Sequence, residues 1–208
     1  MRLLVLGATG GIGLEIVRQA LERSHTVTAF VRAPERLMPF EGRIAVVEGN
    51  LLDSRELARA ITGHDAVLSS FGPRVPIAKT DAHLLRDFAA GLTTAMKQAG
   101  VRRGLVVSTA FLFKDALFPP AYLFGRLLFP GVVADATDME DTLRTSGLDL
   151  TIVRPPQLND RPHTGKYRVR EGHLPFGGFS IARADVADFM IQSAENGTYP
   201  RAIAGVCG

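Results

Sequence analysis

The fold is decided by the stretch RLLVLGATGGIG, which runs from Arg2 to Gly13. Its apolar run, residues 3–6, is typical of a parallel strand that is buried on both faces. After the glycines, apolar residues return at helical spacing and place Ile12, Ile16 and Ala20 on one face. The pattern predicts a strand, a tight glycine turn and an amphipathic helix.

The glycines of this turn follow the spacing Gly-x-x-Gly-x-x-Gly. Gly7 permits a tight turn, Gly10 lets the backbone approach a pyrophosphate, and Gly13 lets the helix pack closely on the strand. The N–H groups at the start of the helix are then available to phosphates. A glycine triplet between a strand and a helix favours a dinucleotide site over a plain turn. The predicted contacts are Gly7, Thr9, Gly10, Gly11, Ile12 and Gly13.

The residue after the second expected strand, residues 27–31, indicates which dinucleotide fits. That residue is Arg32, and no acid precedes Glu35. An NAD site usually has a carboxylate here for the ribose 2′-hydroxyl, whereas an arginine pairs with a 2′-phosphate. Arg32 and Arg36 therefore predict NADP(H) as the cofactor. The alternative for Arg32 is a solvated loop cation.

The rest of the chain alternates apolar runs with amphipathic patterns, which is typical of strands and helices of an α/β fold. We expect helices from about 80 to 98, 133 to 145 and 184 to 194. Residues 1–208 are predicted to form one Rossmann-type domain, a doubly wound parallel sheet with helices on both faces. The further strands are expected at 44–48, 66–68, 105–107, 150–153, 202–206 and, as a short strand, 166–170.

Polar and small residues follow several of these strands. The carboxyl ends of parallel strands meet at one edge of the sheet, beside the cofactor crevice. Asp53 is expected to cap the helix that follows it, and a contact with adenine stays open. The predicted cofactor contacts at this edge are Asn50, Leu51, Ser69, Ser70, Phe71, Gly72, Ser108, Thr109, Arg154, Pro155 and Pro156.

The stretch from about 111 to 132 is crowded with aromatic residues and broken by prolines and glycines. The prolines argue against one continuous helix, and charged residues interrupt any membrane span. We interpret the stretch as an excursion that covers a flat hydrophobic substrate or contacts another subunit. The residues predicted to bind this substrate are Phe111, Phe113, Tyr122 and Gln157.

Composition sets the class of protein. The chain has 208 residues and a net charge of +3 without a Lys/Arg block, which disfavours a nucleic-acid surface. Nothing resembles a signal peptide or a membrane span, and Cys207 stands alone, so we expect a cytoplasmic protein. The five histidines lack metal-ligand spacing, and no metal site is predicted. A monomer or a homodimer is expected.

Several short motifs together carry a family resemblance. They include LGATG at 6–10, STAFL at 108–112, LRTSGL at 143–148, PP at 155–156 and IARADV at 181–186. The chain resembles the atypical, NmrA-like branch of the short-chain dehydrogenases/reductases over nearly its whole length. Within that branch it looks most like the NADPH-dependent flavin reductases, the group of biliverdin reductase B. The resemblance implies hydride transfer from NADPH to a planar acceptor such as a flavin, a tetrapyrrole or a quinone.

The resemblance also implies which residues act. The family's catalytic serine falls on Thr109, with Ser108 beside it, so these are the candidate catalytic residues. The histidine after Pro-Pro falls on Gln157, which cannot donate a proton in the same way; this favours flavin over biliverdin. No tyrosine is followed four residues later by lysine, the usual dehydrogenase pair. An NADP(H)-binding redox sensor is the main alternative, and a sugar-nucleotide epimerase is a weaker one.

Overall fold

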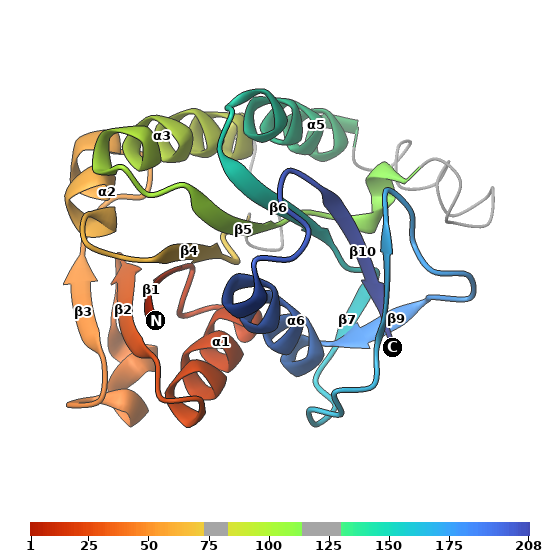
Figure 1. The fold of residues 1–208 in the computed structure, drawn as a ribbon, viewed down its shortest axis with the longest axis horizontal. Helices are drawn as coiled ribbons and strands as arrows, with labels where there is room; N and C mark the ends of the chain where they lie inside the picture. Colours follow the sequence, from red (N-terminus) through yellow and green to blue (C-terminus); the bar gives the residue numbers. More distant parts are fainter. Residues whose placement is uncertain (73–82, 114–129) are drawn as a thin grey trace.

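A twisted sheet of eight strands crosses the middle of the molecule (Figure 1). This computed structural model describes residues 1–72, 83–113 and 130–208. Among the strands of the described residues, the one at 168–171 alone runs antiparallel to its neighbour. From edge to edge the strands are β3 (Ala45–Glu48), β2 (Thr26–Val31), β1 (Arg2–Leu6), β4 (Ala66–Ser69), β5 (Arg103–Val107), β6 (Asp149–Arg154), β10 (Ile203–Cys207) and β8 (Arg168–Glu171).

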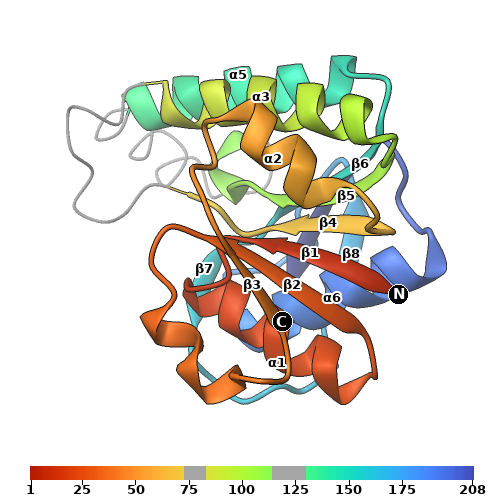
Figure 2. The same cartoon turned by 90° about the vertical axis from the view of Figure 1, so that its left-hand side faces the viewer.

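Helices cover both faces of this sheet, as the two views agree (Figures 1 and 2). One layer holds α1 (Gly11–Glu22) and α6 (Arg183–Asn196), which pack on each other. The opposite layer holds α2 (Ser54–Ile61), α3 (Leu84–Ala99) and α5 (Pro130–Thr145). Two apolar cores fill the spaces between the sheet and these layers. The predicted α/β fold with a doubly wound sheet is confirmed.

The order of the strands places a ligand site. The chain fills the sheet from β1 outward in both directions, through β2 and β3 on one side and β4, β5 and β6 on the other. In open α/β sheets, ligands bind outside the carboxyl ends of the strands where the order reverses. This point lies between β1 and β4, directly after the glycine turn.

Several short elements were not predicted. A 3-10 helix, η1 (Glu35–Phe40), follows β2 and contains Arg36. The strands β7 (Gln157–Asn159) and β9 (Ser180–Ala182) pair as a separate parallel ribbon, so the expected rigid turn ends at Gln157, where a strand begins. Three-residue strands lack a readable period, and their pairing joins segments far apart in the sequence.

The boundaries of the three predicted helices differ from the prediction, and α6, expected at 184–194, spans Arg183–Asn196. Helix α3 begins at Leu84, and the predicted residues 80–82 lie outside the described part. Helix α5 begins at Pro130, so the last residues of the expected excursion are helical; proline is tolerated in a first helical turn because its missing N–H has no partner there. Residues 110–112 form a short 3-10 helix, η3 (Ala110–Leu112). The excursion between 114 and 129 lies outside the described residues.

The expected cap on α2 is present. One carboxylate oxygen of Asp53 accepts hydrogen bonds from the N–H groups of Arg55 and Glu56, at 2.8 and 3.2 Å. These N–H groups are among those that a helix leaves unpaired at its start. They hold the pKa of Asp53 below its usual value because they stabilise the charged form.

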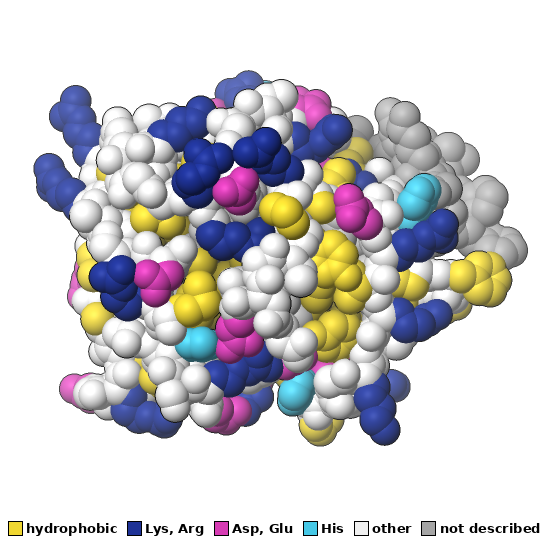
Figure 3. All heavy atoms as spheres, viewed as in Figure 1, with side chains coloured by type: hydrophobic (Ala, Val, Ile, Leu, Met, Phe, Trp, Pro, Cys, Tyr) yellow, Lys and Arg dark blue, Asp and Glu magenta, His cyan; other side chains and the backbone are white. Residues whose placement is uncertain are grey.

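The surface carries mixed charge. On the face in Figure 3, Lys and Arg side chains are spread out and interspersed with Asp and Glu side chains. Across residues 1–72, 83–113 and 130–208, we find no helix that is long and apolar enough to span a bilayer. The cytoplasmic location stays a prediction.

Candidate functional site

The glycine turn after β1 depends on the absence of two side chains. Gly7 has φ of +74°, and a β-carbon there would lie 2.9 Å from the backbone nitrogen of Phe71. A β-carbon on Gly13 would lie 2.1 Å from the carbonyl oxygen of Gly7, closer than any real contact. Gly7 therefore permits the turn, and Gly13 permits α1 to pack against it.

The start of α1 offers backbone donors to a ligand. Gly10 is the N-cap residue, and its N–H donates to the carbonyl oxygen of Gly7 at 2.9 Å. None of the described side chains caps this helix, and its first turn has no acidic residue. The first N–H groups of a helix have no intrahelical partner and carry partial positive charge. This arrangement suits a phosphate.

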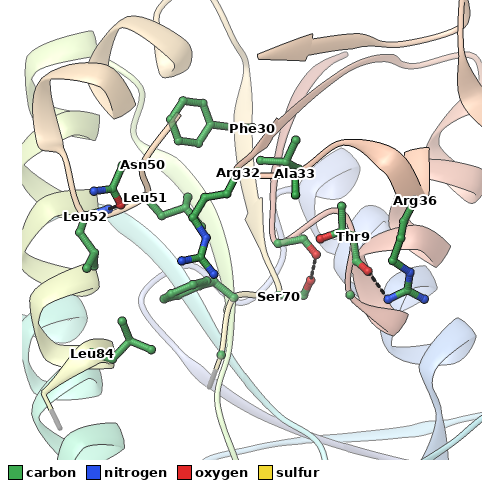
Figure 4. Close-up of a pocket in the computed structure, with 15 residues that line it drawn as sticks. Thr9, Phe30, Arg32, Ala33, Arg36, Asn50, Leu51, Leu52, Ser70 and Leu84 are labelled. Atoms are coloured by element: carbon green, nitrogen blue, oxygen red, sulfur yellow. Dashed lines mark hydrogen bonds between the residues drawn. The ribbon is translucent and has the colours of Figure 1, made fainter. Parts of the chain in front are cut away.

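A cavity of about 880 Å³ opens beside the turn (Figure 4). It brings together ten predicted cofactor contacts from four segments of the chain, and adds five residues that the sequence did not indicate. The ten are Gly7, Thr9, Gly10, Arg32, Arg36, Asn50, Leu51, Ser70, Phe71 and Gly72. The five are Phe30, Val31, Ala33, Leu52 and Leu84.

The two arginines of this cavity have different surroundings. Arg36 donates from Nη1 to the backbone oxygen of Thr9 at 2.6 Å and so braces the glycine turn. Arg32 points into the cavity in Figure 4, is exposed, and has no hydrogen-bond or ion-pair partner among the described residues. An unpaired guanidinium at the end of β2 is the feature that a 2′-phosphate would engage.

The opposite wall of the cavity is a preformed loop. The side-chain oxygen of Asn50 accepts from the N–H of Leu52 at 3.1 Å, and the Asn50 N–H donates to Glu56 at 2.8 Å. These bonds fix the loop that carries Leu51 into the cavity. Asp53 caps α2 and is not part of the cavity lining, so the adenine contact considered for it gains no support.

The other predicted cofactor contacts lie beyond this lining. Gly11, Ile12 and Gly13 belong to the first turn of α1, and Ser69 is fully buried in β4. Two predicted segments far apart in sequence lie side by side beyond β5 and β6. The Ser108 N–H donates to Val153 O at 2.7 Å, and the Ala110 N–H donates to Pro155 O at 3.1 Å. Ser108, Thr109, Arg154, Pro155 and Pro156 are thus gathered at one place on the sheet edge.

A cluster of one half-buried and two buried polar side chains occupies this place. The hydroxyl of Ser108 donates to Oε1 of Glu140 at 2.5 Å. Arg154 donates to the same oxygen from Nε at 2.9 Å and to Oε2 from Nη2. The Arg154 guanidinium also lies 4.5 Å from the ring centre of Phe113. Two nitrogens of Arg154 are therefore committed to Glu140, and its predicted contact with the cofactor stays a prediction.

The predicted substrate residues are dispersed. Phe113 is only 2% exposed and packs with Ala110 and Leu174, so its burial disfavours the expected contact with an acceptor. Gln157 is exposed and begins β7. The side chain of Phe111 and all of Tyr122 lie outside the described part of the chain.

Sequence reasoning missed two residues next to the predicted site. Glu140 lies on the buried face of α5 with Ala136, Met139 and Leu143, and an acid at such a position is a signal for a buried cation. Arg183 covers Gly11, where a β-carbon would lie 2.6 Å from Cδ of the arginine. No sequence spacing indicates that second contact.

The fold, the glycine turn and Arg32, which has no partner in the described part of the chain, define a nucleotide-binding α/β protein of the Rossmann type. Comparison with known proteins narrows the class. The model of the family described as NAD(P)H-binding matches residues 7–197, and the chain belongs to this family. The prediction of a nicotinamide dinucleotide is thereby confirmed, and the chain stands among NAD(P)H-binding oxidoreductases.

Individual relatives cover nearly the whole chain. The uncharacterized sugar epimerase YhfK of Bacillus subtilis is 32% identical over 94% of this chain and 88% of its own length. A short-chain dehydrogenase/reductase of Veillonella parvula in complex with NADP is 20% identical, with a TM-score of 0.84 over 100% of this chain and 94% of that one. ChuY, an anaerobilin reductase of Escherichia coli O157:H7, is 22% identical, with a TM-score of 0.81 over 100% and 97%. At these identities the two structures show the fold alone.

Proposed function

We propose that this chain is an NADPH-dependent reductase that passes a hydride to a flat acceptor such as a flavin. The observation that supports the cofactor choice is Arg32, a cation without a partner in residues 1–72, 83–113 and 130–208, in a cavity that the glycine turn also lines. The residues fit NADP(H): backbone donors at α1 suit the pyrophosphate, and Arg32 suits the 2′-phosphate. When bound, the nicotinamide supplies the hydride chemistry.

The acceptor is inferred from the lack of an acid–base pair. No tyrosine in the sequence precedes a lysine by four residues. The hydroxyl of Tyr167 donates to the buried Asp188 at 2.8 Å, and burial together with this bond raises the pKa of the phenol far above its usual value. Tyr167 is therefore unsuited to proton transfer near neutral pH. An acceptor that takes its proton from solvent, as a reduced flavin does, fits such a site best.

The chain's own contribution is positioning. The turn residues fix the phosphates, while Ser108 and Thr109 stand at the end of β5, where the nicotinamide is expected. Pro155 and Pro156 follow β6 at the same edge of the sheet. Gln157 comes next and is exposed. Holding two planar rings together without water is the main catalytic effect available to these residues.

Two other functions give different experimental outcomes. A redox sensor would bind NADPH without consuming it. An epimerase, the activity in the printed name of YhfK, would isomerise a nucleotide sugar without net oxidation of the cofactor. The missing Tyr-Lys pair disfavours the epimerase.

The test is an assay of NADPH oxidation by the purified chain with FMN, FAD, biliverdin and a quinone. A nucleotide sugar is incubated in parallel and followed by NMR. We expect turnover with FMN, and a Gly10→Val variant serves as the control for uncatalysed reduction. Tight binding of NADPH without turnover of any acceptor would favour the sensor and contradict the reductase.

A further inference from the structure

Ser108, Glu140 and Arg154 form one hydrogen-bonded cluster at the carboxyl edge of the sheet. Glu140 lies on α5, Ser108 follows β5 and Arg154 ends β6, so three elements meet in one hydrogen-bonded group of which Ser108 is the half-buried member. The side chains of Glu140 and Arg154 are 4% and 11% exposed. Burying such a pair is costly unless its geometry is good, and it is often replaceable by apolar residues without loss of stability. Stability alone is therefore a weak reason for its presence.

The hydrogen bonds within the cluster determine whether the Ser108 hydroxyl can donate or accept a further hydrogen bond. A serine hydroxyl has one proton and two acceptor positions. That proton is directed to Oε1 of Glu140 at 2.5 Å. Both oxygens of Glu140 accept hydrogen bonds from Arg154, which has donors and no acceptor, so the cluster holds no donor directed at the Ser108 oxygen. Ser108 is thus left as an acceptor for any further partner.

The position of Ser108 indicates that partner. Strand β5 neighbours β4, whose following residue Ser70 lines the cavity and donates to the Gly7 oxygen at 3.2 Å. A dinucleotide with its 2′-phosphate at Arg32, at the end of β2, crosses β1 and β4 before it reaches β5. These three strand spacings amount to about 14 Å. A dinucleotide of this length would bring its nicotinamide end toward the end of β5, which Ser108 follows, and its carboxamide carries an NH₂ donor.

We propose that Glu140 and Arg154 are positioning residues that hold Ser108 as the acceptor for the nicotinamide carboxamide NH₂ group. Their effect is to fix the rotation of the ring and so the face that an acceptor meets. The proposal rests on the proposed function only for its cofactor, NADP(H), and it requires no particular acceptor. It also implies that Ser108 is no proton donor.

The experiment compares two ligands by isothermal titration calorimetry on the full chain. One is NADP⁺, and the other is 2′-phospho-ADP-ribose, the same molecule without nicotinamide. Ser108→Ala is expected to weaken NADP⁺ about 2- to 13-fold, the range of one neutral hydrogen bond, and to leave 2′-phospho-ADP-ribose unchanged. Ser108→Thr keeps the hydroxyl and is expected to retain the wild-type ratio of the two affinities.

A double-mutant cycle tests whether Glu140 acts through Ser108. Glu140→Gln keeps the volume and is expected to lower the NADP⁺ to 2′-phospho-ADP-ribose affinity ratio in the wild-type background. It is expected to change this ratio no further in the Ser108→Ala background, an outcome that general loosening of the fold would not give. If Glu140→Gln does not fold, Arg154→Lys, which removes the two-nitrogen contact with Glu140, takes its place in the same cycle with the same expected result.

The outcomes separate this proposal from the proposed function. An unchanged ratio in Ser108→Ala, or equal weakening of both ligands, overturns the proposal. Additive effects in the double variant overturn the role of Glu140. The expected ratios in a chain that reduces no acceptor support the proposal and contradict the reductase, whereas binding of neither ligand to the unaltered chain overturns both.

Discussion

The two polar regions at the carboxyl edge of the sheet are built in opposite ways. Around the glycine turn, none of the described side chains caps the start of α1, and Arg32 lines a cavity without a hydrogen-bond or ion-pair partner among the described residues. Beyond β5 and β6, the half-buried Ser108 and the buried Glu140 and Arg154 are bonded to one another. Donors without a protein partner suit a region in which a charged ligand supplies the missing acceptor. Groups that already bond to one another suit a region whose side chains must be fixed in position before the ligand binds.

The largest expected effect is on ligand binding in the open region, by which we mean the cavity around Gly7, Gly10 and Arg32. Gly10→Val adds a branched side chain where even a β-carbon would lie 3.2 Å from the Gly7 oxygen and where we expect the pyrophosphate to approach the backbone. We expect NADPH affinity to fall at least about a thousandfold, or roughly 4 kcal/mol, while circular dichroism shows a folded chain. Gly91→Ala, at a helix position with nothing within 4 Å, is the matched control and should bind normally. Retained binding by a folded Gly10→Val variant would mean that the turn is purely structural.

In the paired region, which consists of Ser108, Glu140 and Arg154, a substitution is expected to change the free energy of unfolding. Glu140→Ala leaves the buried Arg154 without its carboxylate, and breaking one side of a buried pair costs about 3–5 kcal/mol. Urea denaturation measures the loss. Glu22→Ala, which breaks the solvent-exposed pair with Arg18, is the control and should cost about 1 kcal/mol or less. Equal losses in the two variants would remove the contrast between the buried cluster and an ordinary surface pair.

The sequence predicted the open region better than the paired one. Gly7, Gly10 and Arg32 follow one another within a short stretch, and a spacing rule connects them to a ligand. The bond between Glu140 and Arg154 joins a helix to the following strand, and the contact of both with Ser108 depends on how α5 sits on the sheet. Long apolar runs gave the strands of the main sheet, whereas β7 and β9 are too short to have a period.

A smaller effect is expected at the loop that walls the cavity. Asp53→Ala removes the cap of α2 and should lower the melting temperature by roughly 2–4 °C at neutral pH. The folded-state pKa of Asp53 is depressed, so its contribution is present above the unfolded value near 3.8 and is lost as pH falls further. The difference between variant and wild type should therefore vanish in acid. A difference that persists below this pH would point to a cause other than the charged cap.

The smallest effect concerns Cys207, which lies in the core next to the paired region with Ala110 and Phe113. Its side chain is fully buried, and burial raises the pKa of the thiol. Because the thiolate is the reactive form, iodoacetamide should label Cys207 slowly in the native chain and rapidly in urea. Equal labelling rates, followed by mass spectrometry, would show that this core opens readily.

The most direct measurement is the affinity of the chain for NADPH and NADH, with and without Arg32. We expect the unaltered chain to prefer NADPH about 13- to 160-fold, the range for a hydrogen bond to a charged group, and Arg32→Ala to bring the two affinities together. Arg36→Ala is the matched control: Arg36 braces Thr9, so its loss should weaken both dinucleotides alike. Equal affinities in the unaltered chain, or a preference that survives Arg32→Ala, would contradict the assignment of this cavity to NADP(H).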